Sequence, residues 1–270
     1  MKVPETDPLN DLPVWLINLP RATARRVKME AQLASMALPY TLFPGVDGRA
    51  EEARLLANTD IPAFRRNMGR EILIGGIGCY HSHLSVWEAF LATGKPHALV
   101  MEDDVVFHDD FLPALRLALQ AAKHWDLLKL NYIRAKLPVP QGRIGPYRLM
   151  AYVGPNTGTG AYLINRATAA KLLPAMRRVT RATDHEINRF FVHDFRLRGL
   201  EPFPSHVDDG GQSLITGTGF ADVQKFPLFR RLPYYRLKLG NYFRRLGWLG
   251  KRGELWPSHR DLLGGPPPAD

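Results

Sequence analysis

The chain has only one cysteine, Cys79, in 270 residues. One cysteine cannot form an intrachain disulfide, and it cannot supply a cluster of thiolate ligands for zinc. Long hydrophobic runs are also absent, since no apolar stretch reaches the ~18 residues that a membrane-spanning helix requires. The first residues, Met1–Asp7, lack the apolar core of a secretory signal. These absences predict a cytoplasmic protein, and the 45% hydrophobic content is enough for one large domain or two small ones.

Acidic residues are missing from one long stretch. Residues 225–252 contain nine lysines and arginines and no aspartate or glutamate, so they carry +9 of the formal net charge of +10 and leave 10 − 9 = +1 for the rest of the chain. An acidic partner is therefore expected at this segment rather than over the whole surface.

Three consecutive carboxylates, Glu102, Asp103 and Asp104, follow the apolar run 98–101. That run is typical of a short strand buried on both faces of a parallel sheet. Ligands of open α/β sheets bind beyond the carboxyl ends of the strands. Carboxylate oxygens suit a hard cation such as Mg²⁺ or Mn²⁺, which can in turn hold a diphosphate.

A simpler interpretation of these acids remains open. Asp109 and Asp110 follow closely and suit the first turn of a helix, where acidic side chains are favourable. The three carboxylates are then a solvated turn that precedes this helix.

Strand and helix patterns alternate along the chain. They predict strands at residues 14–17, 40–43, 98–101, 126–130 and 158–164, and helices at 23–37, 77–91, 110–123, 166–176 and 183–197. We expect Thr183 and Glu186 to form a capping box at the start of the last helix, residues 136–147 to form a long surface loop, and residues 202–209 to be extended. This alternation favours an α/β fold with a mostly parallel central sheet.

Several motifs stand in a fixed order between residues 13 and 216. They are Ile17-Asn18-Leu19 with Arg21, Arg25 and Arg26; Gly78-Cys79-Tyr80-His81-Ser82-His83; Leu99-Val100-Met101-Glu102-Asp103-Asp104; Thr159-Gly160-Ala161-Tyr162-Leu163-Ile164; Asp184-His185; and Pro204 through Ser213. In this order and spacing they resemble glycosyltransferase family 25, the lipooligosaccharide galactosyltransferases and their collagen-modifying relatives. One position departs from the family pattern, because Gly76 stands where the family usually has glutamate.

The resemblance implies a single GT-A domain and an inverting transfer of a hexose, such as galactose, from a UDP-sugar. A divalent ion between Asp104 and the donor phosphates stabilises the charge of the leaving group. If the strand continues through the acids, Glu102 and Asp104 project to one side and Asp103 to the other. Asp104 is then the direct metal ligand, Glu102 a second ligand or a ribose contact, and Asp103 part of the donor pocket.

The remaining candidates come from the other motifs. An inverting transfer needs a base, and Asp184 is the candidate because it lies at the start of a helix; helix-terminal stabilisation is the competing explanation. His206 is a candidate third metal ligand, or else an ordinary loop histidine. Asn18 and Arg21, with Asp47 as a weaker candidate, are expected in the nucleotide pocket. Cys79 is expected to be a small buried residue rather than a nucleophile.

The basic segment has the pattern of an amphipathic helix. Tyr235, Leu239, Tyr242, Leu246 and Leu249 share one stripe at helical spacing. With basic residues beside it, such a helix suits an anionic membrane surface. Packing of the helix on the catalytic domain is the alternative. Nucleic acid is not expected as a partner, because no nucleic-acid-binding motif accompanies the charge.

We therefore expect a glycosyltransferase domain at residues 1–222, a membrane-surface segment at 223–252 and a disordered tail at 253–270. The predicted acceptor is a lipid-linked oligosaccharide of a lipooligosaccharide or lipopolysaccharide core, reached at the inner face of the cytoplasmic membrane. Two alternatives remain: a metal-dependent phosphoesterase, which also uses clustered acids, and a catalytically weak sugar- or membrane-binding module, for which the glycine at position 76 is the main motive.

Overall fold

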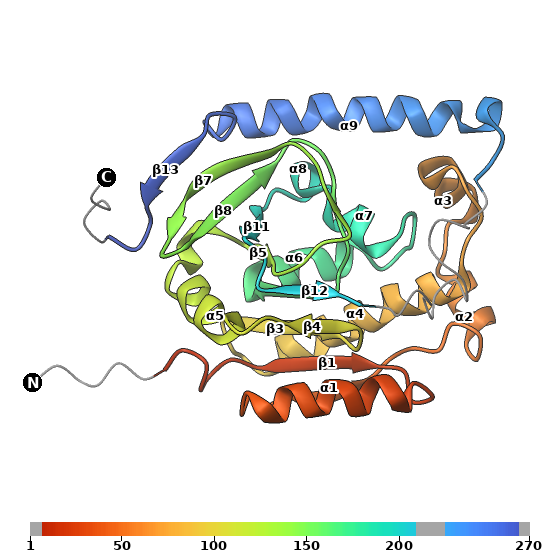
Figure 1. Cartoon of the computed structure of the whole chain (residues 1–270). Coiled ribbons are helices and arrows are strands. Elements are labelled where there is room, and N and C mark those ends of the chain that lie inside the picture. Colours follow the sequence, from red (N-terminus) through yellow and green to blue (C-terminus); the bar gives the residue numbers. More distant parts are fainter. Residues whose placement is uncertain (1–6, 209–224, 265–270) are drawn as a thin grey trace, which may run out of the picture.

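A nine-stranded sheet forms the centre of the molecule (Figure 1). The computed structural model describes residues 7–208 and 225–264. In spatial order the strands are β13 (Ser258–Asp261), β7 (Pro138–Ile144), β8 (Tyr147–Tyr152), β11 (Leu197–Glu201), β5 (Leu127–Lys129), β10 (Ala161–Asn165), β3 (His97–Glu102), β1 (Val14–Asn18) and β2 (Thr41–Pro44). Only β8 and β10 run against the other seven strands. The predicted α/β architecture with a mostly parallel sheet is therefore confirmed.

Helices cover both faces of the sheet, and each face has its own hydrophobic core. One core contains Met29 and Leu33 of α1 (Thr23–Ser35) and Phe111 of α5 (Phe111–Gln120). The other contains Trp87 of α4 (Ile74–Ala92) and side chains of α3 (Ile61–Met68) and α6 (Arg166–Ala175). The central strands are buried on both sides for this reason, which explains the unbroken apolar run of β3.

Short elements fill the connections. They are the helices α2 (Glu52–Ala57), η1 (Ala122–His124), α7 (Thr183–Ile187), α8 (Phe190–His193) and η3 (Leu228–Arg231), and two small sheets, β4 (Val105–Phe107) with β12 (Ser205–Val207) and β6 (Arg134–Ala135) with β9 (Asn156–Thr157).

The surface loop predicted at residues 136–147 is wrong. This stretch contains β7 and the turn that leads into β8, and the two strands form a hairpin. Its prolines are tolerated because Pro138 and Pro140 pair only with β8, before β13 begins to pair at Gln141. Proline is accommodated where one side of a strand has no neighbour, and the register irregularity between Pro140 and Gly142 takes up the remaining misfit.

The single helix predicted at residues 183–197 is also wrong. Two short helices, α7 and α8, take its place, and Asp194, with a φ of 52°, ends the second of them. No side chain caps α7. The carboxylate of Glu186 instead contacts Arg181, Arg189 and His193, so the predicted capping box does not form.

The long helix α9 (Leu232–Lys251) lies along one side of the molecule (Figure 1). Trp248 and Leu249 belong to the core shared with α4, so the carboxyl-terminal half of this helix packs on the domain. No helix in the described ranges combines the length and hydrophobicity needed to cross a bilayer.

The disordered tail predicted from residue 253 is wrong for residues 258–261, which form β13 and pair with β7. The buried side chain of Leu262 extends this contact into the core. Residues 265–270 lie outside the described residues, and so do residues 209–213 of the last motif.

Candidate functional site

A cavity of about 920 Å³ opens at the edge of the sheet where β1, β3 and β5 end. Because β10 is antiparallel, its first residues reach the same edge. The walls come from the ends of β1 and β3, the segment before β10, the first turn of α4, and the helices α7 and α9. The predicted position of a ligand site, beyond the carboxyl ends of the strands, thus coincides with a real cavity.

The three consecutive acids all line this cavity. β3 ends at Glu102, and Asp103 and Asp104 belong to the turn that follows. Strand alternation therefore does not apply beyond Glu102, and the prediction that Asp103 points away from Asp104 is wrong. Arg25 of α1 contacts both aspartates, at 3.4 Å from Oδ1 of Asp103 and 3.5 Å from Oδ2 of Asp104.

Asp104 is the acid with the least support from its surroundings. Its Oδ1 atom is buried and has no hydrogen-bond partner in the described part of the chain. Burial, together with the charge of Glu102, raises the pKa of Asp104 to about 7. Burial also raises the pKa of Asp103, against the opposing effects of Asn18 and Arg25. Such a cluster is stabilised when a cation binds.

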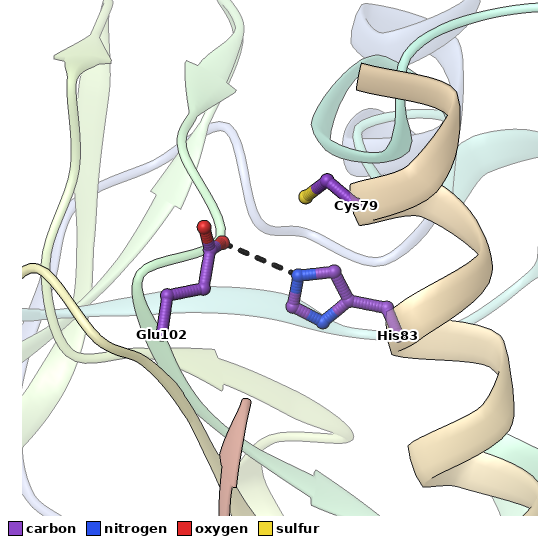
Figure 2. Close-up of side chains that lie close together, drawn as sticks. All are labelled: Cys79, His83 and Glu102. Atoms are coloured by element: carbon purple, nitrogen blue, oxygen red, sulfur yellow. Dashed lines mark hydrogen bonds and ion pairs between the residues drawn. The ribbon is translucent and has the colours of Figure 1, made fainter. Parts of the chain in front are cut away.

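Glu102 is held by two side chains, one of which, His83, is shown in Figure 2. Its Oε1 atom lies 3.2 Å from Nε2 of His83 and 2.5 Å from the hydroxyl of Thr159, which donates to it. Although burial opposes ionisation, the hydrogen bond and charge of His83 and the bond from Thr159 bring the pKa of Glu102 below its ordinary value. Glu102 is thus an oriented carboxylate.

Cys79 lies one helical turn before His83 on α4, and Figure 2 shows both side chains directed toward Glu102. One potential ligand atom from each of the three residues falls within 4.8 Å of the others. Burial, and next the charge of Glu102, raises the pKa of the Cys79 thiol well above its usual range. The thiol is therefore protonated, which argues against a nucleophile. Cys79 is only partly buried and lines the cavity, so it is not the fully buried residue that was expected.

Of the residues predicted for the nucleotide pocket, Arg21 lines the cavity, whereas Asn18 and Asp47 hold the lining residues in place. Asn18 is buried, and its amide donates to Oδ2 of Asp103 at 2.6 Å, so it orients an acid of the site. Arg21 lines the cavity and forms an ion pair with Asp47. Asp47 also accepts a hydrogen bond from the backbone of Arg49, so it holds the rim in place.

Asp184, in the first turn of α7, also lines the cavity. Its oxygens accept hydrogen bonds from the backbone N–H groups of Gly158, at 3.2 Å, and His185, at 2.8 Å. Although burial opposes ionisation, the neighbouring His185 and Lys129 and these two hydrogen bonds lower the pKa of Asp184. The carboxylate is ionised and directed, which suits a hydrogen-bond acceptor more than a strong base.

His206 does not share this cavity. It pairs with Val106 on the short sheet, and its exposed ring meets Nε2 of His108 at 2.9 Å. Its neighbour Val207 lines the cavity instead, as the alternation of side chains along a strand requires. We therefore do not retain His206 as a metal ligand.

Several residues in or behind the cavity lining were not predicted. Lys129 ends β5, is 1% exposed, and donates to the carbonyl oxygens of Asn156 and Gly158. Burial lowers its pKa to about 8, with Asp184 and Glu102 opposing that effect. The sequence did offer a signal for Lys129, because it lies near the end of the strand predicted at 126–130, the next one along the chain after the strand that ends in the three acids. Arg70 and Arg245 carried no comparable signal, since they approach the cavity only through tertiary packing.

The fold and the cavity define an α/β protein with a carboxylate cluster at the strand ends of its central sheet. The family model described as "Glycosyltransferase family 25 (LPS biosynthesis protein)" matches residues 11–187. The chain belongs to this family. The matched range contains every acid of the cavity described above and ends before α9 begins.

The curated relatives include a protein named as a galactosyltransferase and others named as inactive. The zebrafish Procollagen galactosyltransferase 1 is 25% identical over 81% of this chain and 40% of its own length. A Glycosyltransferase 25 family member of Aedes aegypti is 28% identical over 77% and 38%. The human Inactive glycosyltransferase 25 family member 3 is 33% identical over 59% and 28%. The chain thus spans well under half the length of these relatives.

Among solved structures, mannose-1-phosphate geranyltransferase from Thermus thermophilus aligns with 74% of this chain and 76% of its own, at a TM-score of 0.37 and 16% identity. A similarity this weak says nothing further about function.

Proposed function

We propose that this protein is an inverting glycosyltransferase that moves a hexose, galactose in the first instance, from a UDP-sugar to an oligosaccharide acceptor of lipopolysaccharide synthesis. The observation that carries the proposal is Asp104: a buried, unpartnered carboxylate oxygen beside two further acids, in a cavity of about 920 Å³. The name of the matching family and the galactosyltransferase among the relatives support the choice of reaction and acceptor.

The donor set of the acidic turn fits a hard divalent cation, Mn²⁺ or Mg²⁺, because it offers carboxylate oxygens and no thiolate. Asp104 has the free oxygen, and Glu102 is already oriented by His83. When bound, such an ion supplies positive charge that stabilises a diphosphate leaving group.

The protein's own groups account for the rest of the transfer. Asp184 accepts a hydrogen bond from the attacking hydroxyl of the acceptor and takes its proton as the new bond to the anomeric carbon forms. The bond from that carbon to the diphosphate breaks, and its electron pair leaves with the diphosphate. The lowered pKa keeps Asp184 ionised, so it accepts the hydrogen bond of the acceptor hydroxyl throughout; as a weak base it takes the proton only when the hydroxyl becomes acidic, as the bond to the anomeric carbon forms.

Binding of UDP-galactose in the presence and absence of Mn²⁺, measured by calorimetry, tests the proposal. Wild type should bind only with the metal, and Asp104→Asn should lose this metal-dependent binding. Asp109→Asn is the matched control, since Asp109 is an exposed acid outside the cavity lining. UDP-glucose and UDP-N-acetylhexosamines, tested in the same way, establish the donor. No binding of any UDP-sugar under any metal condition would overturn the transferase proposal.

Measurement of turnover distinguishes the proposed transferase from two alternatives. The first alternative is a binding module, which is suggested by the relatives named inactive and by the glycine at position 76. A binding module would bind the donor but would not transfer the sugar. A phosphoesterase predicts release of phosphate from simple esters with no sugar acceptor present.

A membrane surface is proposed as the place of the reaction. The face of α9 that points away from the domain exposes Leu232, Leu239 and Phe243, at 58%, 59% and 65%, and the exposed basic residues Arg236 and Arg244 lie on the same helix. An apolar stripe with basic neighbours suits an anionic leaflet. This placement is consistent with a cytoplasmic, peripheral protein that acts on a lipid-linked acceptor.

The stripe differs from the one expected. Tyr242 lines the cavity and Leu249 is buried in the core, so these two residues are not available to a membrane. Leu239 and Leu246 remain exposed.

A further inference from the structure

The end of the cavity beside α9 has the opposite electrostatic character from the acidic turn. Arg70, from the link between α3 and α4, and Arg245, from α9, both line it. Burial, and then the charges of Arg70, Arg245 and Arg181, lower the pKa of His185 at the start of α7, against the charge of Asp184. Arg181 is paired with Glu186 at 3.0 Å. Arg70 and Arg245 have no such partner among the described residues, and Lys225, Arg231 and Lys238 add further positive charge to the lining.

Arg245 is more than nine-tenths buried, since only 5% of its surface is exposed. One Nη atom donates to the backbone oxygen of Asn188 at 3.1 Å, while Nε is buried and has no hydrogen-bond partner. Its guanidinium otherwise lies near the rings of Phe191 and Tyr242. Burial lowers its pKa to about 10, and no carboxylate of the described residues forms an ion pair with it.

Arg70 is in a similar position. Its Nη1 atom is buried without a hydrogen-bond partner, and its guanidinium lies 5.9 Å from the centre of the Phe64 ring. Burial lowers its pKa, and the charge of Asp184 opposes that effect without a direct contact. Within the described ranges, Arg70 has no ion pair either.

Desolvated charges of this kind are costly unless an opposite charge accompanies them. Two such arginines facing one cavity supply several N–H donors in planar forks, which match the oxygens of phosphate and carboxylate groups. The missing counter-charge is therefore expected to arrive with a ligand.

We propose that Arg70 and Arg245 form a subsite for a phosphate or carboxylate group carried by the acceptor. This inference rests on the proposed function and adds the chemical class of its acceptor, an anionic saccharide. The acceptor is favoured over the donor diphosphate because hydrogen bonds link Asp184 to both ends of the cavity. Gly158, which donates to the Asp184 carboxylate, precedes Thr159, which donates to Glu102, and Asn188, which accepts from Arg245, donates to the Asp184 carbonyl oxygen. The donor phosphates belong beside Asp104, and the acceptor hydroxyl beside Asp184.

Inorganic phosphate is the probe, titrated calorimetrically into the full chain without metal. Arg70→Gln and Arg245→Gln should each weaken phosphate binding by about tenfold or more, the range expected for losing hydrogen bonds to a charged group. Arg244→Gln is the matched control, since Arg244 neighbours Arg245 on α9 but is exposed, and it should bind phosphate as wild type does. No phosphate binding by wild type, or equal binding by all four proteins, would overturn the subsite.

Stability without phosphate separates a ligand subsite from a structural role. Removal of an uncompensated charge should leave the thermal midpoint of Arg70→Gln unchanged or raised, and phosphate should no longer shift it. A lowered midpoint for both variants would assign the arginines to the fold and overturn the subsite. If Arg245→Gln does not fold, the thermal midpoint of Arg70→Gln, with and without phosphate, tests the subsite by itself, because Arg70 is less buried.

A second titration identifies the source of the anion. Phosphate is added to protein saturated with UDP and Mn²⁺. Unchanged phosphate affinity supports the acceptor assignment, whereas displacement by UDP would give the arginines to the donor diphosphate and overturn that assignment. If phosphate binds while UDP does not, the transferase proposal fails and the anion site stands.

Discussion

His83 and Glu102 are joined by a hydrogen bond of 3.2 Å between Nε2 and Oε1, and the other ring nitrogen of His83 lies 2.9 Å from the hydroxyl of Tyr162. Trp87 donates to the same hydroxyl, also at 2.9 Å. The Tyr162 hydroxyl therefore links Trp87 to one ring nitrogen of His83, while the other ring nitrogen meets Glu102. A buried chain of three residues thus sets the orientation of one acid of the site.

Replacement of His83 by glutamine should weaken metal-dependent UDP binding by about tenfold to a hundredfold, the usual effect of losing a residue that orients a ligand. His81→Gln is the control, because His81 lies on the same helix but does not contact Glu102. Calorimetry with Mn²⁺ and UDP measures the effect. Equal affinities in the two variants would show that Glu102 needs no such support.

Metal binding should depend on pH through Asp104. Because the pKa of Asp104 is about 7, protons compete with the metal below that value and no longer compete above it. The affinity for Mn²⁺ should fall by about tenfold from about pH 8 to about pH 6, since one carboxylate must lose its proton. An affinity that stays flat over this range, with the protein still folded, would contradict the assignment of Asp104 as the ligand.

Glu186 should make the protein sensitive to acid. Burial opposes its ionisation, but hydrogen bonds and charges from His193, Arg189 and Arg181 bring its pKa from 4.5 to about 2. The unfolded chain therefore takes up the proton first as the pH falls. On the order of 3 kcal/mol of stability, present above about pH 5, should be lost by about pH 2.

Denaturant unfolding at a series of pH values measures this loss. Glu186→Gln should be destabilised at pH 7 and should lack this part of the acid dependence. Glu88→Gln, an exposed acid on α4, is the control. A wild-type pH profile matched by Glu186→Gln would refute the assignment.

Two glycines should respond to alanine in opposite directions. Gly142 in β7 has a φ of 149°, and a Cβ atom there would lie 2.5 Å from the Leu262 side chain. Gly142→Ala should cost about 1–3 kcal/mol, from overpacking and backbone strain. Gly240, within α9, has nothing within 4 Å of its Cβ position, so Gly240→Ala should gain up to about 1 kcal/mol. Urea unfolding compares them, and a stable Gly142→Ala variant would argue against the packing of β13.

Vesicle sedimentation tests the membrane surface. Phe243→Gln and Leu239→Gln should each reduce binding to vesicles rich in phosphatidylserine, because each removes an exposed apolar side chain from α9. Val27→Gln is the control, since Val27 is 65% exposed on α1, a different helix. If neither change in α9 affects vesicle binding, the membrane proposal fails, and the helix serves only as a wall of the cavity.

The parts of the fold that the sequence predicted are those fixed by local patterns. β3 follows from an apolar run that needs no partner to be recognised, and α1 and α4 follow from helical spacing. The hairpin of β7 and β8 was missed because prolines and glycines usually mark loops, and only the late pairing of β13 explains how Pro140 is accommodated.

The residues of the candidate site could likewise be predicted only where a local sequence pattern marks them. Glu102 and Asp104 were found because adjacent acids at a strand end are visible in sequence. Arg245 was not, since it lies 141 positions beyond Asp104 (245 − 104) and reaches the cavity only because α9 folds back along the domain. Membrane contact was expected for the stripe that includes Tyr242, yet that side chain faces the cavity.

The helix that brings Arg245 to the cavity lies apart in the chain from the stretch that supplies Arg70 and the carboxylates. The family match, residues 11–187, supplies the carboxylates, whereas the helix that closes the opposite end lies beyond it. Under the proposed function, a change confined to α9 would therefore alter the acceptor side of the cavity and leave the carboxylates in place.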